Sequence, residues 1–235
     1  MNTPFNFVEG EVLLVDKPLT WTSFDVVNKL RYAILKKLET RRIKVGHAGT
    51  LDPLASGLLV ICTGKLTKEI ERYQAQEKEY EGEFLLGQTT PSYDAETEVD
   101  QTFETAHISP ALIQTTLEQF RGEIQQVPPV FSAIKVDGKR LYKQARKGRE
   151  IIIDPRPVYI HEFEITEMTL PRLKFRVVCS KGTYIRSLAH DFGQALGSGA
   201  YLSALCRTRI GAFRLQDAYV LPDLVALIQN APNRE

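Results

Sequence analysis

A twelve-residue segment, Gly46–Gly57, gathers the residue types that could do chemistry: a histidine, an aspartate, a proline and three glycines. Its aspartate, Asp52, is followed by Pro53-Leu54, and an apolar run, Leu58–Cys62, comes soon after. An ionised carboxylate in such apolar surroundings is unfavourable unless a cation meets it. Asp52 is therefore either an ordinary cap or turn residue or a buried carboxylate with a chemical role. The pattern alone specifies no reaction.

Arg186 is a candidate cation for this carboxylate. We expect Thr183 to cap a helix, and Arg186 falls in the first turn of that helix. A cation there opposes the helix dipole, which is mildly unfavourable unless an anion lies near. Two interpretations stay open: a solvated arginine, or an arginine that pairs with a buried carboxylate and keeps it ionised. The apolar face of the predicted helix consists of Ile185, Leu188, Ala189, Phe192 and Leu196.

Two ring side chains are further candidates. Tyr80 opens a predicted half-buried strand, in which apolar and polar residues alternate as far as Leu86. A strand tyrosine usually packs against its neighbours, but it can also present its ring to a nucleobase. His47 stands beside glycines and is either structural or a flat ring that fills the space left by a displaced base.

The elements that must position these residues follow from apolar spacing and from cap and turn signals. We expect further helices from an N-cap at Ser23 with Asp25 in the first turn, through Ile70 and Tyr73, from Ser109-Pro110 towards Gly122, over Leu141–Lys147 up to Gly148, and over Leu221–Gln229. We expect strands over Glu11–Val15, Leu58–Cys62, Tyr80–Leu86, Ile151–Leu170, Leu173–Ser180 and Tyr201–Phe213. Residues 46–57 are a predicted loop, and an acidic stretch, 91–106, is a predicted surface loop. Asp137-Gly138 is a predicted turn.

The order of these elements indicates the fold class. Helices and strands are interspersed without a regular βαβ repeat, which favours an α+β fold over a doubly wound sheet. We expect a mixed, mostly antiparallel central sheet flanked by helices and loops. The 235 residues are enough for one large domain or two small ones. Because no internal repeat or low-complexity linker is present, we expect a single domain over residues 1–235.

Charge is distributed unevenly along the chain. The net charge of +1 would not by itself predict binding to nucleic acid. However, Arg31–Lys44 contains six basic residues against one acidic residue, and Lys135–Arg149 contains seven against one. Such segregation can give a nearly neutral molecule a basic face that binds nucleic acid. The alternative is a set of solvated helix faces.

Composition argues against several classes of protein. The three cysteines, Cys62, Cys179 and Cys206, each lie alone in an apolar run, which is typical of buried reduced thiols. The four histidines are dispersed without metal-ligand spacing, so we expect no structural metal. No apolar stretch is long enough to span a membrane, and the first ten residues do not read as a signal peptide. We expect a cytosolic protein.

Six motifs, in order along nearly the whole chain, carry a family resemblance. The chain resembles the TruB family of tRNA pseudouridine synthases, and the match is strongest at Gly46–Gly57, which looks like that family's catalytic loop. A match of one motif would be weak, whereas six in register are specific. The others are Leu14–Pro18 with Thr22-Ser23, Lys78-Glu79-Tyr80 with Leu86-Gly87, Gln126–Tyr142, Ser180–Arg186 and Leu205–Arg209.

The resemblance implies a role for each site residue. Asp52 would be the catalytic aspartate, and Arg186 would pair with it. Tyr80 would stack on the target uracil and take part in the proton step at C5, and Leu205 would line the uracil pocket. The two remaining residues would serve the loop and the RNA: Lys17, with Pro18, would shape the motif beneath the catalytic loop, and His47 would occupy the place of the flipped base.

The resemblance also implies a substrate. The chain would isomerise uridine 55 in the T stem-loop of tRNA, without a cofactor or metal, as a monomer away from membranes. Longer members of the family carry a C-terminal RNA-binding domain of the PUA type, for which we expect no room before Glu235. Three alternatives are a relative that modifies another RNA with the help of guide RNAs, a non-catalytic RNA-folding protein, and a glycosidase-like hydrolase. The last would need a second carboxylate near Asp52, and none is evident in its loop.

Overall fold

The computed structural model describes residues 5–132, 135–136, 139–140 and 153–231. Its elements fall into two compact units: a first unit, Met1–Tyr80 with Leu205–Glu235, and a second unit, Glu81–Ala204. The chain passes between the units within two strands, β4 (Lys78–Leu86) and β12 (Ala200–Ile210). The single-domain organisation stays a prediction.

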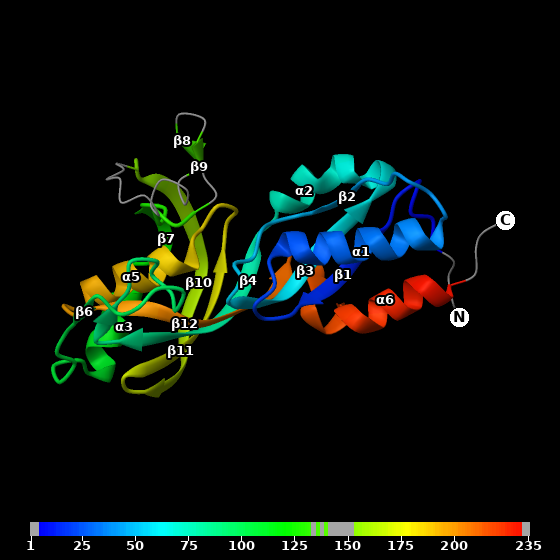
Figure 1. Ribbon diagram of the computed structural model, residues 1–235. Coiled ribbons are helices and arrows are strands. Elements are labelled where there is room, and N and C mark those ends of the chain that lie inside the picture. The colour runs from blue at the N-terminus through cyan, green and yellow to red at the C-terminus, as the bar shows by residue number, and fades with distance from the viewer. Residues whose placement is uncertain (1–4, 133–134, 137–138, 141–152, 232–235) are drawn as a thin grey trace. The chain divides into compact units, whose positions relative to one another are not determined.

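The strands of the first unit surround one buried strand, β3 (Figure 1). They follow the order β14-β1-β3-β12, in which β3 is antiparallel to β1 and parallel to β12. The nearly continuous burial of β3 confirms the buried strand predicted over Leu58–Cys62. The strands not yet bounded are β1 (Val12–Lys17), β2 (Val45–His47), β3 (Ala55–Thr63), β13 (Phe213–Arg214) and β14 (Tyr219–Val220).

The loop predicted over residues 46–57 is shorter than expected. Its first two residues belong to β2 and its last three to β3, because β2 pairs with β3 in antiparallel register, Gly46 opposite Cys62. Only residues 48–54 connect the two strands. The strand predicted over Tyr201–Phe213 is likewise interrupted, since β12 ends at Ile210 and β13 turns back to pair with it.

Two helices, α1 (Ser23–Lys37) and α6 (Leu221–Asn230), lie side by side in the first unit (Figure 1). Their apolar faces share one core with β1 and β3, in which Val26, Leu30 and Leu224 are almost fully buried. Burial of such a side chain contributes about 1.5–3 kcal/mol. The remaining helical segments of this unit are η1 (Gly64–Glu69), α2 (Ile70–Gln74) and η2 (Leu215–Asp217).

The N-cap of α1 is Thr22, so the prediction of Ser23 was wrong by one residue. Thr22 and Asp25 form a capping box, in which the Thr22 side chain accepts from the Asp25 N–H and the Asp25 carboxylate accepts from the Thr22 N–H. This reciprocal pair satisfies two backbone donors, which a cap at Ser23 would not do. Ser23 is left free to make a tertiary contact at the functional site.

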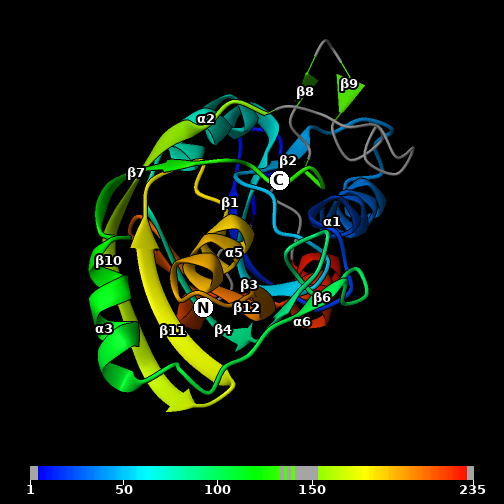
Figure 2. The same ribbon diagram turned by 90° about the vertical axis from the view of Figure 1, so that its left-hand side faces the viewer.

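The second unit packs helices on a sheet with an aromatic core. Its strands follow the order β4-β11-β10-β7, and β10 is antiparallel to both of its neighbours. Helix α5 packs against this sheet (Figure 2), where Phe192 of α5 lies among Phe84, Phe163 and Phe175 of the strands. The bounds are β7 (Gly122–Gln126), β10 (Arg156–Thr169), β11 (Arg172–Cys179), α3 (Pro110–Glu118) and α5 (Ile185–Ala195).

The caps of these helices were predicted with mixed success. Ser109 caps α3 and accepts from the N–H of Leu112, as predicted. The N-cap of α5 is Tyr184 rather than Thr183, because the Thr183 hydroxyl donates backwards to the carbonyl of Ser180. The predicted apolar face of α5 is buried.

The acidic stretch 91–106 is not purely a surface loop. Ser92 and Asp94 are buried, and a short antiparallel pair, β5 (Gln88–Thr89) with β6 (Gln101–Thr102), closes the stretch. Strands β8 (Lys135–Val136) and β9 (Lys139–Arg140) also pair in antiparallel fashion. The predicted turn between them and the predicted helix over 141–147 lie outside the described residues.

The architecture confirms an α+β fold with a mixed, mostly antiparallel sheet. Among the strand pairs given, β1 with β14 and β3 with β12 are parallel, and the others are antiparallel. None of the helices in the described part of the chain combines the length and apolar character needed to cross a bilayer.

Candidate active site

Asp52 lies half-buried in the connection between β2 and β3. Its own carbonyl accepts from the N–H of Ala55 at 3.1 Å, which closes a turn. The preceding residue, Leu51, donates its N–H to the Ser23 hydroxyl at 2.9 Å, and that hydroxyl lies 3.2 Å from the Leu51 carbonyl. The carbonyl of Pro53 accepts from the N–H of Thr20 at 2.8 Å. The backbone is therefore fixed on both sides of Asp52 by the segment that begins α1.

Lys17 lies beneath this loop, at the end of β1, and is fully buried. Its ammonium donates to the carbonyls of Pro18 at 2.9 Å and Trp21 at 2.6 Å and lies 3.5 Å from that of Pro53. Burial lowers the pKa of Lys17 to about 8, and the negative charge of Asp52 opposes this effect. Lys17 thus ties the chain before α1 to the Asp52 loop, and its charge lies within Coulombic reach of Asp52.

A second buried cation, Arg207, was not among the predicted site residues. It lies on β12 opposite Gly57, and its guanidinium donates to the carbonyls of Leu58 at 2.8 Å and Gly49 at 3.1 Å. Gly57 has a φ of +100°, and a Cβ there would lie 2.4 Å from the Arg207 carbonyl oxygen, so only glycine fits. The available signal in the sequence was its place in the motif Leu205–Arg209.

His47 ends β2, half-buried beside the same loop. Burial lowers its pKa, and the charge of Arg207 acts in the same direction, while a hydrogen bond with the Gly49 backbone opposes them. The ring is therefore neutral at pH 7. A neutral, flat ring is compatible with the predicted place of a flipped base, which stays a prediction.

Tyr80 and Leu205 belong to the two strands that leave the first unit. Tyr80 is buried in β4. Leu205 is half-buried in β12. It lies opposite Ala55 of β3, which is parallel to β12, and Ala55 follows Asp52 by three residues. Five of the six predicted site residues thus lie in the first unit: Lys17, His47, Asp52, Tyr80 and Leu205.

Arg186 lies in the second unit, in the first turn of α5, and is buried. Its Nε lies 3.6 Å from a carboxylate oxygen of Asp94, and its Nη1 donates to the Ser92 carbonyl at 3.3 Å. The solvated interpretation is therefore wrong, and the anion that a first-turn arginine requires is supplied by Asp94. The pairing of Arg186 with Asp52 stays a prediction.

Asp94 was missed because its stretch was predicted to be a surface loop. It is buried, and its carboxylate accepts from the Ser92 hydroxyl at 2.6 Å and from the Glu96 N–H at 3.0 Å. The signal in the sequence was local: serine and threonine two and three residues away, a spacing typical of side chains that bond to nearby backbone.

This arrangement can support chemistry at a carboxylate. Asp52 has a fixed backbone, partial burial and a buried ammonium within Coulombic reach. Attraction between opposite charges favours the ionised form of both partners. An ionised carboxylate held in this way can act as a nucleophile or as a general base. In the described ranges, no group of three or more His, Cys, Asp and Glu residues is placed to hold a metal ion.

Comparison with known proteins identifies the family. Residues 36–185 match the model of the TruB family pseudouridylate synthase N-terminal domain, and residues 186–235 match the model of the tRNA pseudouridylate synthase B C-terminal domain. The chain belongs to the TruB family. The resemblance drawn from the six motifs is thereby confirmed, as is the prediction of an isomerase of the pseudouridine synthase class.

Curated TruB relatives are similar over most of their length. The "tRNA pseudouridine synthase B" of Flavobacterium johnsoniae is 60% identical over 217 residues, which cover 92% of this chain and 95% of that protein. The protein of the same name from Phocaeicola vulgatus is 58% identical, with 90% of each chain covered.

Solved structures agree with the TruB assignment. The chain is similar to one in the crystal structure of a Cbf5-Nop10-Gar1 complex, with 32% identity and a TM-score of 0.70 over 94% of this chain. A chain in the structure of an H/ACA RNP bound to a substrate RNA containing 2′-deoxyuridine gives 29% identity and a TM-score of 0.66. This chain spans about half the length of those chains, 54% and 53%.

Proposed function

We propose that this TruB-family enzyme isomerises uridine 55 in the T loop of tRNA to pseudouridine, with Asp52 as its catalytic carboxylate. Relatives named tRNA pseudouridine synthase B, up to 60% identical, support the substrate class. The single observation that carries the role of Asp52 is the anchoring of Leu51 and Pro53 from both sides above the buried ammonium of Lys17.

The reaction breaks the bond between C1′ and N1, turns the uracil, and joins C1′ to C5. The ribose C1′ gains positive character as the base leaves, as in glycoside hydrolysis, and a carboxylate can stabilise or trap that centre. Asp52 acts either by covalent attack at C1′ or as the base that forms a glycal. Water must be kept away from C1′ in both routes, which suits a partly buried carboxylate.

The target base must leave its stack before Asp52 can reach the ribose. Flipping costs a few kcal/mol. His47, neutral at pH 7, fills the place of the base. Tyr80 stacks on the flipped uracil and takes part in the proton step at C5, and Leu205 lines the uracil pocket.

Arg186 pairs with Asp52 in the working enzyme. Its guanidinium is oriented by Asp94 and the Ser92 carbonyl, which leaves a planar donor group with a defined direction. Such an arginine favours the ionised form of the catalytic carboxylate.

The RNA is recognised through its T stem-loop. Basic residues of Arg31–Lys44 and Lys135–Arg149 bind phosphates, so affinity should fall with salt. We propose that the enzyme acts as a monomer in the cytoplasm, where its substrate is found.

The test is tritium release from a tRNA transcript labelled at C5 of uridine, with wild type and Asp52→Asn compared side by side. Wild type should release tritium from position 55, and Asp52→Asn should release none while it binds tRNA with nearly unchanged affinity. Equal loss of binding and turnover would assign Asp52 a structural role. Tight binding without release by either protein would favour a non-catalytic RNA-folding protein.

A second candidate is pseudouridylation of another RNA. The observation in its favour is the likeness to chains in Cbf5 and H/ACA structures, at 29–32% identity. The tRNA assignment is preferred because the relatives named for tRNA are nearly twice as similar, at 58–60%. Tritium release from a labelled ribosomal RNA but not from tRNA would reverse this preference.

A further inference from the structure

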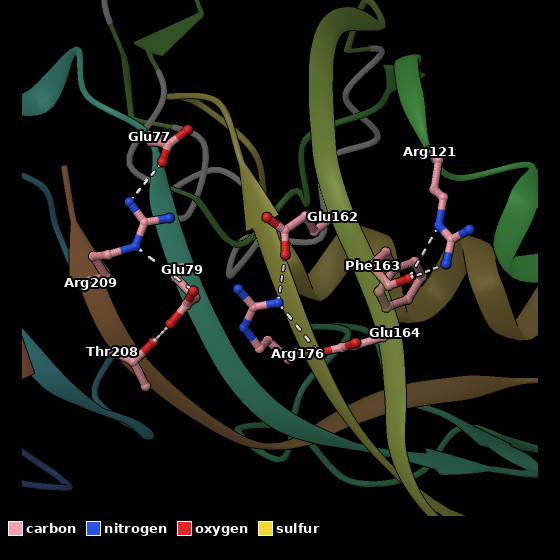
Figure 3. A network of polar contacts seen from close by, with 9 residues as sticks. All are labelled: Glu77, Glu79, Arg121, Glu162, Phe163, Glu164, Arg176, Thr208 and Arg209. Atoms are coloured by element: carbon pink, nitrogen blue, oxygen red, sulfur yellow. Dashed lines mark hydrogen bonds and ion pairs between the residues drawn. The ribbon is translucent and has the colours of Figure 1, made fainter.

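Three consecutive charged residues lead the chain into Tyr80, and each has its side chain in a polar contact. The side chains of Glu77 and Glu79 reach Arg209 and Thr208 of β12, as Figure 3 shows. Lys78, which is buried, donates to the carbonyls of Gln74 and Gln76. Three neighbours held in this way leave the backbone before Tyr80 little freedom.

Arg209 is the centre of these contacts. Its Nη1 lies 2.7 Å from a carboxylate oxygen of Glu77, and its Nε lies 3.7 Å from one of Glu79. Thr208 donates to the other oxygen of Glu79 at 2.8 Å. A backbone hydrogen bond joins the same two segments, because the N–H of Gly211 donates to the Glu77 carbonyl at 3.0 Å.

Partial burial makes this cluster stronger than a surface ion pair. The side chains of Arg209 and Glu79 are only 16% and 15% exposed. Exposed pairs contribute little because water and salt screen them, whereas partly desolvated charges interact more strongly. Removal of one partner would also leave the other charge poorly solvated.

The strand that supplies Arg209, β12, also contacts the Asp52 loop. Leu205 of β12 lies opposite Ala55, and Arg207 binds the carbonyl of Gly49. Over the five residues Leu205–Arg209, this strand therefore contacts both ends of the Asp52 loop and the segment that carries Tyr80. A strand is a stiff element, so it can hold the two groups at a set spacing.

We propose that Arg209, with Thr208 and Glu79, is a positioning group that sets Tyr80 against the Asp52 loop through β12. The inference rests on the role proposed for Tyr80. None of the three needs to touch the RNA; they act through the placement of the tyrosine. Misplacement of a reacting group by about 1 Å can cost about 100-fold in rate, so the signature is a slower chemical step with unchanged binding of tRNA.

The experiment measures the single-turnover rate, with enzyme in excess, and the Kd for tRNA. Arg209→Ala should slow the rate about 10- to 100-fold and leave Kd within about 2-fold. Arg209→Lys, which keeps the charge, should recover part of the rate. Thr208→Val, which is close in shape and removes one hydrogen bond, should give a smaller loss and serves if Arg209→Ala fails to fold.

The matched control is Arg176→Ala. Arg176 lies on β11 in the second unit and, like Arg209, faces two carboxylates, Glu162 at 2.7 Å and Glu164 at 3.3 Å. Its removal should change the rate by less than about 2-fold. If Arg176→Ala and Arg209→Ala lost the same amount of rate, the loss would reflect general destabilisation, and the proposal would be overturned.

A double-mutant cycle tests whether Arg209 acts through Tyr80. In a Tyr80→Phe background, which lacks the hydroxyl of the proton step, Arg209→Ala should cost less than about 3-fold. Fully additive losses would show that Arg209 acts elsewhere and overturn the inference while the function stands. An unchanged rate in Tyr80→Phe alone would overturn both the role of Tyr80 and this inference. The function itself fails separately, if wild type releases no tritium.

Discussion

Among the residues that the structure describes, each unit buries one arginine, and the two are stabilised by different means. Arg207 in the first unit donates to two backbone carbonyls, whereas Arg186 in the second unit faces the carboxylate of Asp94. Carbonyls satisfy the donors of a guanidinium but carry no net charge. Arg207 therefore projects positive charge onto its surroundings. It adds to the effect of burial, which is the main cause of the lowered pKa of both Lys17 and His47.

The roles proposed for the two arginines differ in the same way. The cation held by carbonyls stiffens the loop of Asp52 and keeps the field near it positive. The cation held by a carboxylate has its charge partly offset and its orientation fixed, which suits a directed partner. Substitutions at the two arginines should therefore have different consequences.

The largest effect is expected at Arg186. Arg186→Ala leaves Asp94 buried without its cation, which should lower the free energy of unfolding by about 3–5 kcal/mol and abolish most activity. Arg186→Lys should retain more activity, since lysine keeps the charge but loses the planar fork. Urea denaturation and tritium release measure the two quantities.

A second substitution tells charge from packing at this site. Asp94→Asn in the Arg186→Ala background removes the uncompensated charge and should recover about half of the lost stability without restoring activity. No recovery would mean that the loss comes from packing, and the contrast between the two arginines would disappear.

Arg207→Ala should be the next most severe. It leaves two buried carbonyls with fewer donors, and the expected loss is about 2–3 kcal/mol of unfolding free energy. Because this loss does not come from a carboxylate left without its cation, replacing a nearby acid by its amide should not restore the stability. Rescue by Asp52→Asn, in the loop that Arg207 binds through Gly49, would contradict the carbonyl-held description if the same denaturation showed it.

These two arginines also show which features of the structure local sequence patterns can predict. Apolar spacing predicted α1 and the buried face of α5, because such periodicity depends only on which side of an element meets the core. The contacts of Arg207 with Gly49 span 158 residues in sequence, and those of Arg186 with Ser92 span 94. Local propensity does not encode such pairs, so Arg207 and Asp94 were missed as site residues although the motif around Asp52 was found.

The cap of α1 gives the same lesson at short range. Ser23 and Thr22 are both acceptable caps by residue type, and the choice is decided by what each can do elsewhere. Thr22 completes a box with Asp25, while Ser23 is needed 28 residues away at Leu51. The tertiary contact, which the sequence did not show, settles a local assignment.

Lys17 offers a pH test of its own burial beneath the Asp52 loop. The pKa of Lys17 is lowered from 10.5 to about 8, so between these values the unfolded chain binds a proton that the folded chain lacks. Stability from this group is lost as pH falls through 8 and gained as pH rises towards 10.5. The unfolding free energy of wild type minus that of Lys17→Met should rise by about 2 kcal/mol from pH 8 to pH 9.5. A flat difference would mean that Lys17 titrates normally and that burial does not desolvate its ammonium.

The smallest effect separates the loop anchor from the helix cap. Ser23→Ala removes the hydroxyl bound to both backbone groups of Leu51, and Thr22→Ala removes the cap of α1 next to it. Each should cost about 1 kcal/mol of stability. Only Ser23→Ala should also slow the chemical step, by about 3- to 10-fold, because it loosens the residue that precedes Asp52. Equal rates for the two variants would show that the Asp52 loop is positioned from β12 alone, with Arg207 rather than α1 as its support.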